Sequence, residues 1–124
     1  MIPHPTSKKD FRAFREAFAW WQERLGLSCW DVDFTHKAQP PGELASCASD
    51  SEASAATVNL AKSWGSHKVM PEQLHITALH EALELMFAPM CEIAANRDFS
   101  PTQLDREKHR VIGQLEKVLG KTKE

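Results

Sequence analysis

The sequence has no excess of basic residues, no closely spaced pair of cysteines and no long apolar run. Its 124 residues carry 15 lysines and arginines against 17 aspartates and glutamates, for a net charge of -2. Proteins that bind nucleic acid usually show a basic excess, so this balance argues against a nucleic-acid partner. A membrane span needs about 18 consecutive apolar residues or more, and the N-terminus lacks the apolar segment of a secretory signal. We therefore expect a cytoplasmic protein that has no membrane partner.

Three cysteines, at positions 29, 47 and 91, are scattered along the chain without Cys-x-x-Cys spacing. An odd number of cysteines in a chain with no secretory signal favours reduced thiols in a cytosol. We expect each of them to act as a small, buried apolar residue. The composition leaves the oligomeric state open.

The length suits a single domain that covers residues 1–124 and forms a core without disulfides. Residues 1–6 contain two prolines, and we expect them and residues 121–124 to be flexible. Three segments, 30–36, 44–48 and 55–60, carry strand patterns, which predicts a small antiparallel sheet of about three strands.

Helical signals lie on both sides of these strands. Ser7 begins a helix with an aromatic stripe, and Ser100 begins another at the signal Ser-Pro-Thr-Gln. Pro89 should end the helix between them, which leaves residues 89–99 irregular. The predicted helices run from Ser7 to Gly26, from Pro71 to about Phe87, and from Ser100 to about Gly120. Strands that are separate in sequence from helices indicate an α+β fold.

The second predicted helix contains the segment His80-Glu81-Ala82-Leu83-Glu84. His80 and Glu84 are four residues apart and share a helix face, and Glu81 lies about 100° around the axis from His80. Two metal ligands one turn apart, with a carboxylate beside them to move a proton, are typical of zinc hydrolases. The sequence therefore predicts His80 and Glu84 as ligands of one zinc ion and Glu81 as the catalytic residue.

Apolar residues surround this segment on nearly every side of the helix, which predicts a buried helix. A buried carboxylate and imidazole need partners, and a divalent cation would keep Glu84 ionised and His80 neutral. The alternative is a plain hydrogen-bonded pair of His80 and Glu84 without a metal ion.

A catalytic zinc site needs a third protein ligand, and His109 in the last helix is our choice. It lies at the margin of that helix's apolar stripe, where it could point into the seam between two packed helices. Glu116, two turns further on, is the fallback ligand or an outer partner for a ligating histidine. The alternative is an exposed His109 among charged residues.

The pattern resembles the zincin metallopeptidases, and more closely the small phage- and prophage-type metallopeptidase-like proteins built as minimal zincins. The matching residues are His80, Glu81 and Glu84, followed by Glu107 and His109. The resemblance covers about residues 70–119. One position departs from it, since the family pattern has histidine where this chain has Glu84.

The resemblance implies a zinc-dependent peptidase, in the host-cell cytosol if a phage encodes it, with a strand bordering a cleft over the active helix. The substrate would be a peptide or protein, and we expect it to pair with strand 30–36 or strand 55–60. Two other functions stay open at this point. One is a metal-binding module that does not cleave, and the other is a metal-free protein-interaction module.

Overall fold

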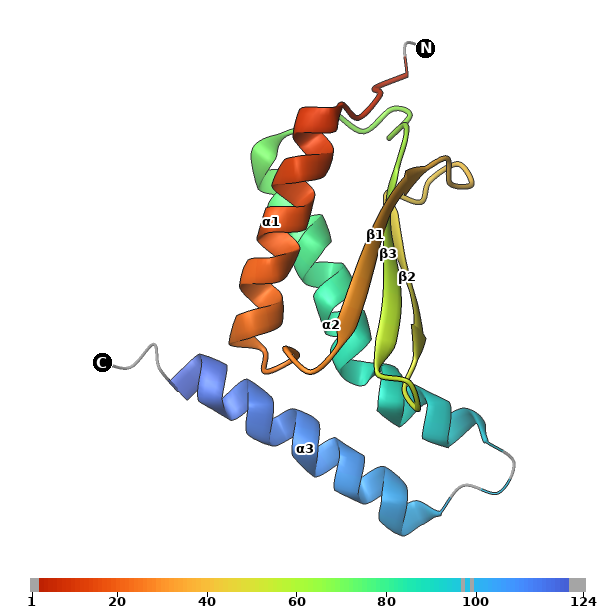
Figure 1. The fold of residues 1–124 in the computed structure, drawn as a ribbon, viewed down its shortest axis with the longest axis vertical. Helices are drawn as coiled ribbons and strands as arrows, with labels where there is room; N and C mark the ends of the chain where they lie inside the picture. The colour runs from red at the N-terminus through yellow and green to blue at the C-terminus, as the bar shows by residue number, and fades with distance from the viewer. Residues whose placement is uncertain (1–2, 97, 99, 121–124) are drawn as a thin grey trace.

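A computed structural model describes residues 3–96, 98 and 100–120 of the chain. It contains three helices and three strands in the order helix, three strands, two helices (Figure 1). Their bounds are α1 Lys8–Arg24, β1 Asp31–Lys37, β2 Ala45–Asp50, β3 Ala55–Ala61, α2 Pro71–Ala95 and α3 Pro101–Gly120. The predicted α+β class and the predicted order of elements are confirmed. Within the described residues, no helix combines the length and the apolar character that crossing a bilayer requires.

The sheet is mixed, so the prediction of a wholly antiparallel sheet is wrong in part. Its strand order is β1-β3-β2, with β3 parallel to β1 and antiparallel to β2. The chain passes from β1 to the far edge of the sheet, forms β2 there, and returns through a tight turn into the centre. Alternation of apolar and polar residues shows which strand face is buried but does not specify the neighbouring strand.

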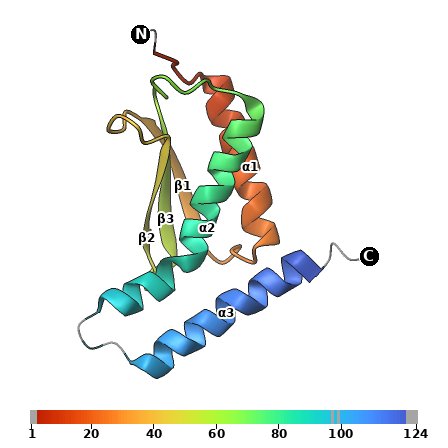
Figure 2. The same cartoon turned by 180° about the vertical axis from the view of Figure 1, so that it is seen from behind.

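One face of the sheet packs against helices. Phe34 of β1 lies opposite Val58 of β3, which in turn lies opposite Cys47 of β2, so the three side chains share a face. Phe34 meets Phe18 of α1 edge to face, with ring centroids 5.4 Å apart. Figures 1 and 2 show α1 and α2 together on this side of the sheet and α3 crossing near the lower end of both.

The helix ends follow the signals in the sequence. Ser7 and Asp10 form a reciprocal capping box at the start of α1, and Gly26, at a φ of 71°, follows its end. At the start of α3, the Gln103 N–H donates to Ser100 Oγ.

One predicted boundary is wrong. α2 continues through Pro89 to Ala95, so residues 89–95 are helical rather than irregular. Residues 3–6, which we expect to be flexible, make hydrogen bonds to the rest of the chain: the His4 N–H donates to the Gly65 carbonyl, and the Thr6 hydroxyl donates to the Ala61 carbonyl. The other residues expected to be flexible, 1–2 and 121–124, lie outside the described part of the chain.

Candidate metal centre

His80, Glu81 and Glu84 come together on α2. Each of them offers one ligand atom, and the three atoms all lie within 4.8 Å of one another. His80 Nε2 is 3.5 Å from Glu84 Oε1. The spacing in the sequence predicted this grouping, and the helix produces it because residues one turn apart are neighbours.

The three residues divide between two faces of α2. Glu81 belongs to the buried stripe of the helix and is 3% exposed, whereas the side chains of His80 and Glu84 are 68% and 52% exposed. The buried stripe of α2 consists of Leu74, Thr77, Ala78, Glu81, Ala82, Leu85 and Met86. The candidate ligands therefore face outward, while the carboxyl between them points into the protein.

The outward face of α2 is also partly apolar, so the prediction of a helix buried all round is wrong. Ile76 is 57% exposed and Phe87 is 37% exposed, on either side of His80 and Glu84 along the helix. Strand β2 is the edge of a narrow sheet, and α2 lies beside that edge. The sheet therefore leaves the outer side of α2 uncovered.

The carboxyl of Glu81 is poorly satisfied in this position. Its Oε1 atom is buried and has no hydrogen-bond partner among the described residues. Burial, followed by a hydrogen bond with Glu84 and the charge of Glu84, raises the pKa of Glu81 from its ordinary 4.5 to about 8. A buried carboxyl with an unsatisfied oxygen destabilises the fold, which is common at functional sites and rare elsewhere.

A pocket of about 510 Å³ opens over these residues between β2 and α2. Its walls are residues 42–47 from the strand side and Gln73, Ile76, Thr77, His80, Glu81 and Glu84 from the helix side. A second pocket of about 560 Å³ continues along the same two elements toward Phe87 and Glu92. Cys47, His80 and Glu84 line both pockets, so the candidate ligands lie where the two meet.

Cys47 faces the same carboxyls across the pocket. Burial, followed by the charges of Glu81 and Glu84, raises the pKa of the Cys47 thiol to about 12. The structure therefore adds to the site a strand residue that was expected to serve only as core. The small side chains of segment 44–48 gave no sign that it borders a polar pocket, because alternation identifies a face but not its neighbours.

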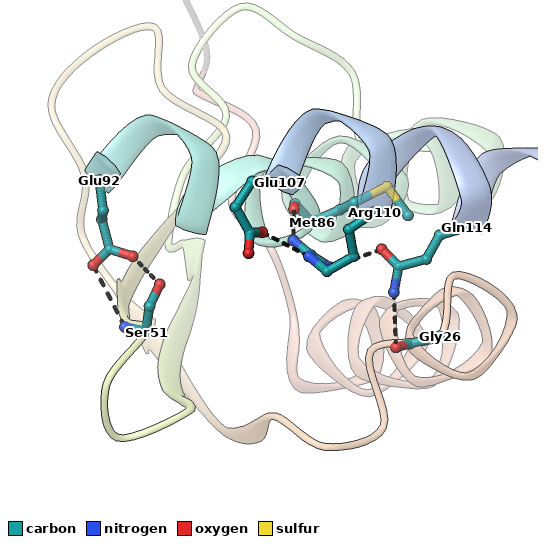
Figure 3. A network of polar contacts seen from close by, with 7 residues as sticks. All are labelled: Gly26, Ser51, Met86, Glu92, Glu107, Arg110 and Gln114. Carbon is teal, nitrogen blue, oxygen red and sulfur yellow. Dashed lines mark hydrogen bonds and ion pairs between the residues drawn. The ribbon is translucent and has the colours of Figure 1, made fainter. Parts of the chain in front are cut away.

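The structure does not bring His109 to this group. Its side chain is 66% exposed, and its Nε2 atom is 3.4 Å from Asp105 Oδ2 of the same helix. The next two residues are turned toward the protein: the Arg110 guanidinium donates to the Met86 carbonyl of α2 (Figure 3), and Val111 is buried. His109 precedes Arg110 by about 100° around the axis and is turned away from the seam.

The two acidic candidates of α3, Glu107 and Glu116, also lie away from the three donors on α2. Glu116 is exposed and outside the group of three donors. Glu107 accepts a hydrogen bond of 2.7 Å from Arg110 Nε, as Figure 3 shows. Within the described residues, α2 thus contributes two outward-facing candidate ligands and one buried carboxyl, and α3 contributes no donor to the group.

The strand beside the pocket differs from the two that we expected to receive a peptide. Strand β3 (55–61) is central and paired on both sides, and β1 (31–37) is the opposite edge of the sheet. Strand β2 is the edge strand at the pocket, and within the described residues its outer side pairs with no other strand.

Comparisons of the chain with protein-family models, with curated proteins and with solved structures find no match.

Proposed function

We propose that this protein is a zinc-dependent peptide hydrolase whose site lies between β2 and α2. The observation that carries the proposal is the buried Glu81 carboxyl, with an unpaired oxygen, at the wall of a pocket beside two outward-facing ligand candidates. A helix that served only packing would place an apolar residue at this position. The sequence resemblance to the minimal zincins supports the same function.

The donors fit a divalent cation. Imidazole nitrogen and carboxylate oxygen are both ligands of zinc, and His80 and Glu84 are exposed enough to turn toward an ion. A bound zinc ion supplies a Lewis acid that polarises a carbonyl group and lowers the pKa of water. The positive charge would also favour the ionised form of Glu81, which its burial disfavours.

Glu81 would act as the general base and then as the general acid. Burial and Glu84 raise its pKa to about 8 in the metal-free chain, and a bound cation would lower that pKa, so Glu81 would be ionised and able to accept a proton. In the proposed reaction Glu81 accepts a proton from the attacking water and passes it to the amine of the cleaved peptide bond. The substrate would lie extended along β2, whose outer side can pair with it.

The test uses the untagged chain, with measurements of bound zinc and of cleavage of a peptide library. We expect Glu81→Gln to keep the metal and lose about 10²–10⁴-fold in turnover, the usual contribution of a general base. We expect His80→Ala to weaken zinc binding by at least about 100-fold, more than the loss of an outer partner of a ligand costs.

His109→Ala is the matched control, because it removes an exposed imidazole that lies outside the group of three donors. It should bind zinc as the wild type does. Unchanged zinc binding in His80→Ala, or loss of zinc in His109→Ala, would exclude the proposed site.

One observation favours a second function, a metal-binding module without turnover. Glu81 is itself one of the three donors within 4.8 Å of one another, so it could ligate the ion instead of serving as a base. In that case Glu81→Gln would weaken zinc binding, and the wild type would cleave no peptide. The same set of measurements therefore separates the two functions.

A further inference from the structure

Cys47 is placed on the edge strand so that its side chain points toward α2. It lies opposite Val58 on β3, and Val58 is fully buried on the face that the helices cover. Side chains directly opposite one another in a sheet share a face, so Cys47 is on that face as well. Among the residues that the structure describes, β2 is an edge strand of the sheet, and α2 is in contact with it. The thiol therefore borders the space between the strand and the helix.

The residues nearest to that space are the candidate ligands. Cys47 lines both pockets together with His80 and Glu84, and it is close enough to Glu81 and Glu84 for their charges to act on the thiol. A second observation points to a ligand at the same place. Glu81 lines the first of these pockets and is 3% exposed, and its Oε1 atom has no hydrogen-bond partner in the described part of the chain.

We propose that Cys47 is the third protein ligand of the cation held by His80 and Glu84, and that the cation displaces the thiol proton to solvent as the sulfur–metal bond forms. The inference rests on the proposed function and extends it, because it names the donor that α3 does not supply. Cys47 lies outside the three donors that are within 4.8 Å of one another, so His80 and Glu84 must turn toward it. Their side chains are 68% and 52% exposed, which leaves them free to do so.

This ligand set determines which metals bind and what Glu81 does. One thiolate, one imidazole and one carboxylate favour zinc, cobalt and cadmium over magnesium and calcium, which prefer oxygen ligands alone. With Cys47 as a ligand, Glu81 is free to act as the base.

Cobalt(II) is the probe, because a cobalt–thiolate bond gives a charge-transfer band in the near ultraviolet. The full chain is titrated with cobalt in a reductant that does not bind metals, and calorimetry records binding separately. We expect the band in the wild type and in the double variant Cys29→Ser/Cys91→Ser, whose one remaining cysteine is Cys47. Cys47→Ser should lose the band and bind cobalt at least about tenfold more weakly.

Cobalt binding without the band, or a band that survives Cys47→Ser, would overturn the role of Cys47 and leave the proposed hydrolase intact. A wild type that binds no cobalt and no zinc would overturn both. Alkylation of the wild type is a check that needs no variant: zinc should slow modification of Cys47 and leave the exposed Cys29 unaffected. Equal rates at Cys47 with and without zinc would contradict the inference.

Discussion

At the scale of single residues, Glu81 is an ionisable group in a position where a stable core would have an apolar side chain. Its carboxyl is buried on the packing side of α2, and its pKa of about 8 makes folding depend on pH. The folded chain holds a proton on Glu81 over a range in which the unfolded chain has already released it. The stability of the metal-free protein should therefore fall as the pH rises from 4.5 toward about 8.

We predict that Glu81→Gln removes this dependence. The amide keeps the shape of the side chain and cannot ionise. The free energy of unfolding of the variant should therefore rise relative to that of the wild type as the pH rises. The difference near pH 8 should be on the order of a few kcal/mol, since each pKa unit corresponds to about 1.4 kcal/mol. Urea unfolding at about pH 5 and pH 8, in the presence of a chelator, measures it.

Glu116→Gln is the control for this experiment, because Glu116 is exposed on α3. Its stability profile should run parallel to that of the wild type. If the profile of Glu81→Gln also ran parallel to the wild type, Glu81 would be ionised in the folded protein and the argument from its burial would fail.

The sequence predicted part of the site at this scale, for a physical reason. His80 and Glu84 are neighbours because of the helix geometry alone, and the structure confirms that Glu81 joins them. His109 could be placed only by knowing how α3 is rotated against α2. His109 lies next to the Ile112 side of its helix's apolar stripe, and that side is exposed in the structure. The sequence pattern did not show which side of the stripe would pack against α2.

At the scale of elements, the continuity of α2 depends on packing rather than on local preference. Pro89 lies inside the helix, where it removes one backbone hydrogen bond and crowds the carbonyl of Leu85. The helix nevertheless continues to Ala95, and the figures show it changing direction in its second half (Figure 1). The Glu92 carboxylate accepts hydrogen bonds from Ser51 in the β2–β3 turn, which ties this second half to the sheet (Figure 3).

We predict that Pro89→Ala raises the free energy of unfolding by about 1–3 kcal/mol, because it restores the missing hydrogen bond and removes the steric conflict. Pro71→Ala is the matched control. Pro71 is the first residue of the same helix, where proline is well tolerated, so its replacement should not raise the free energy of unfolding. A stability decrease in Pro89→Ala would show that the bend itself is required by the packing of α2.

The contact between α2 and α3 depends on few residues. Val111 is the one buried residue within the described helix α3, at 2% exposed, and Arg110 beside it donates to the Met86 carbonyl of α2. Figure 3 also shows Gln114, which donates to the Gly26 carbonyl just after α1. The amphipathic pattern of the sequence predicted that α3 forms, but it did not show that the Val111 side of the apolar stripe, rather than the Ile112 side, would be buried.

We predict that Val111→Ala lowers the free energy of unfolding by about 1–2 kcal/mol through lost burial. Ile112→Ala removes a similar β-branched side chain that is 42% exposed, so it should change stability by less than about 0.5 kcal/mol. Both substitutions improve helix propensity, and the difference between them isolates the burial term. Equal effects on thermal unfolding would mean that Val111 does not anchor α3.

At the scale of the whole molecule, the candidate site lies where the sheet and the helices meet. Strand β2 belongs to the sheet and α2 belongs to the helical layer, and the two pockets that contain His80 and Glu84 run between them. A cation held there from both sides would link the two layers. Metal binding should therefore report on the folding of the entire chain rather than on one helix.

We predict that zinc raises the free energy of unfolding by about 2.7 kcal/mol when its free concentration is about 100 times Kd. The gain should vanish in His80→Ala and persist in His109→Ala, since His109 does not join the donors in this structure. It should also shrink as the pH is lowered, because imidazole binds a metal ion only after it has lost its proton. Urea unfolding with buffered zinc and with a chelator measures the stability of each variant with and without the ion. If zinc stabilised His80→Ala as much as the wild type, the ion would bind at some other part of the chain.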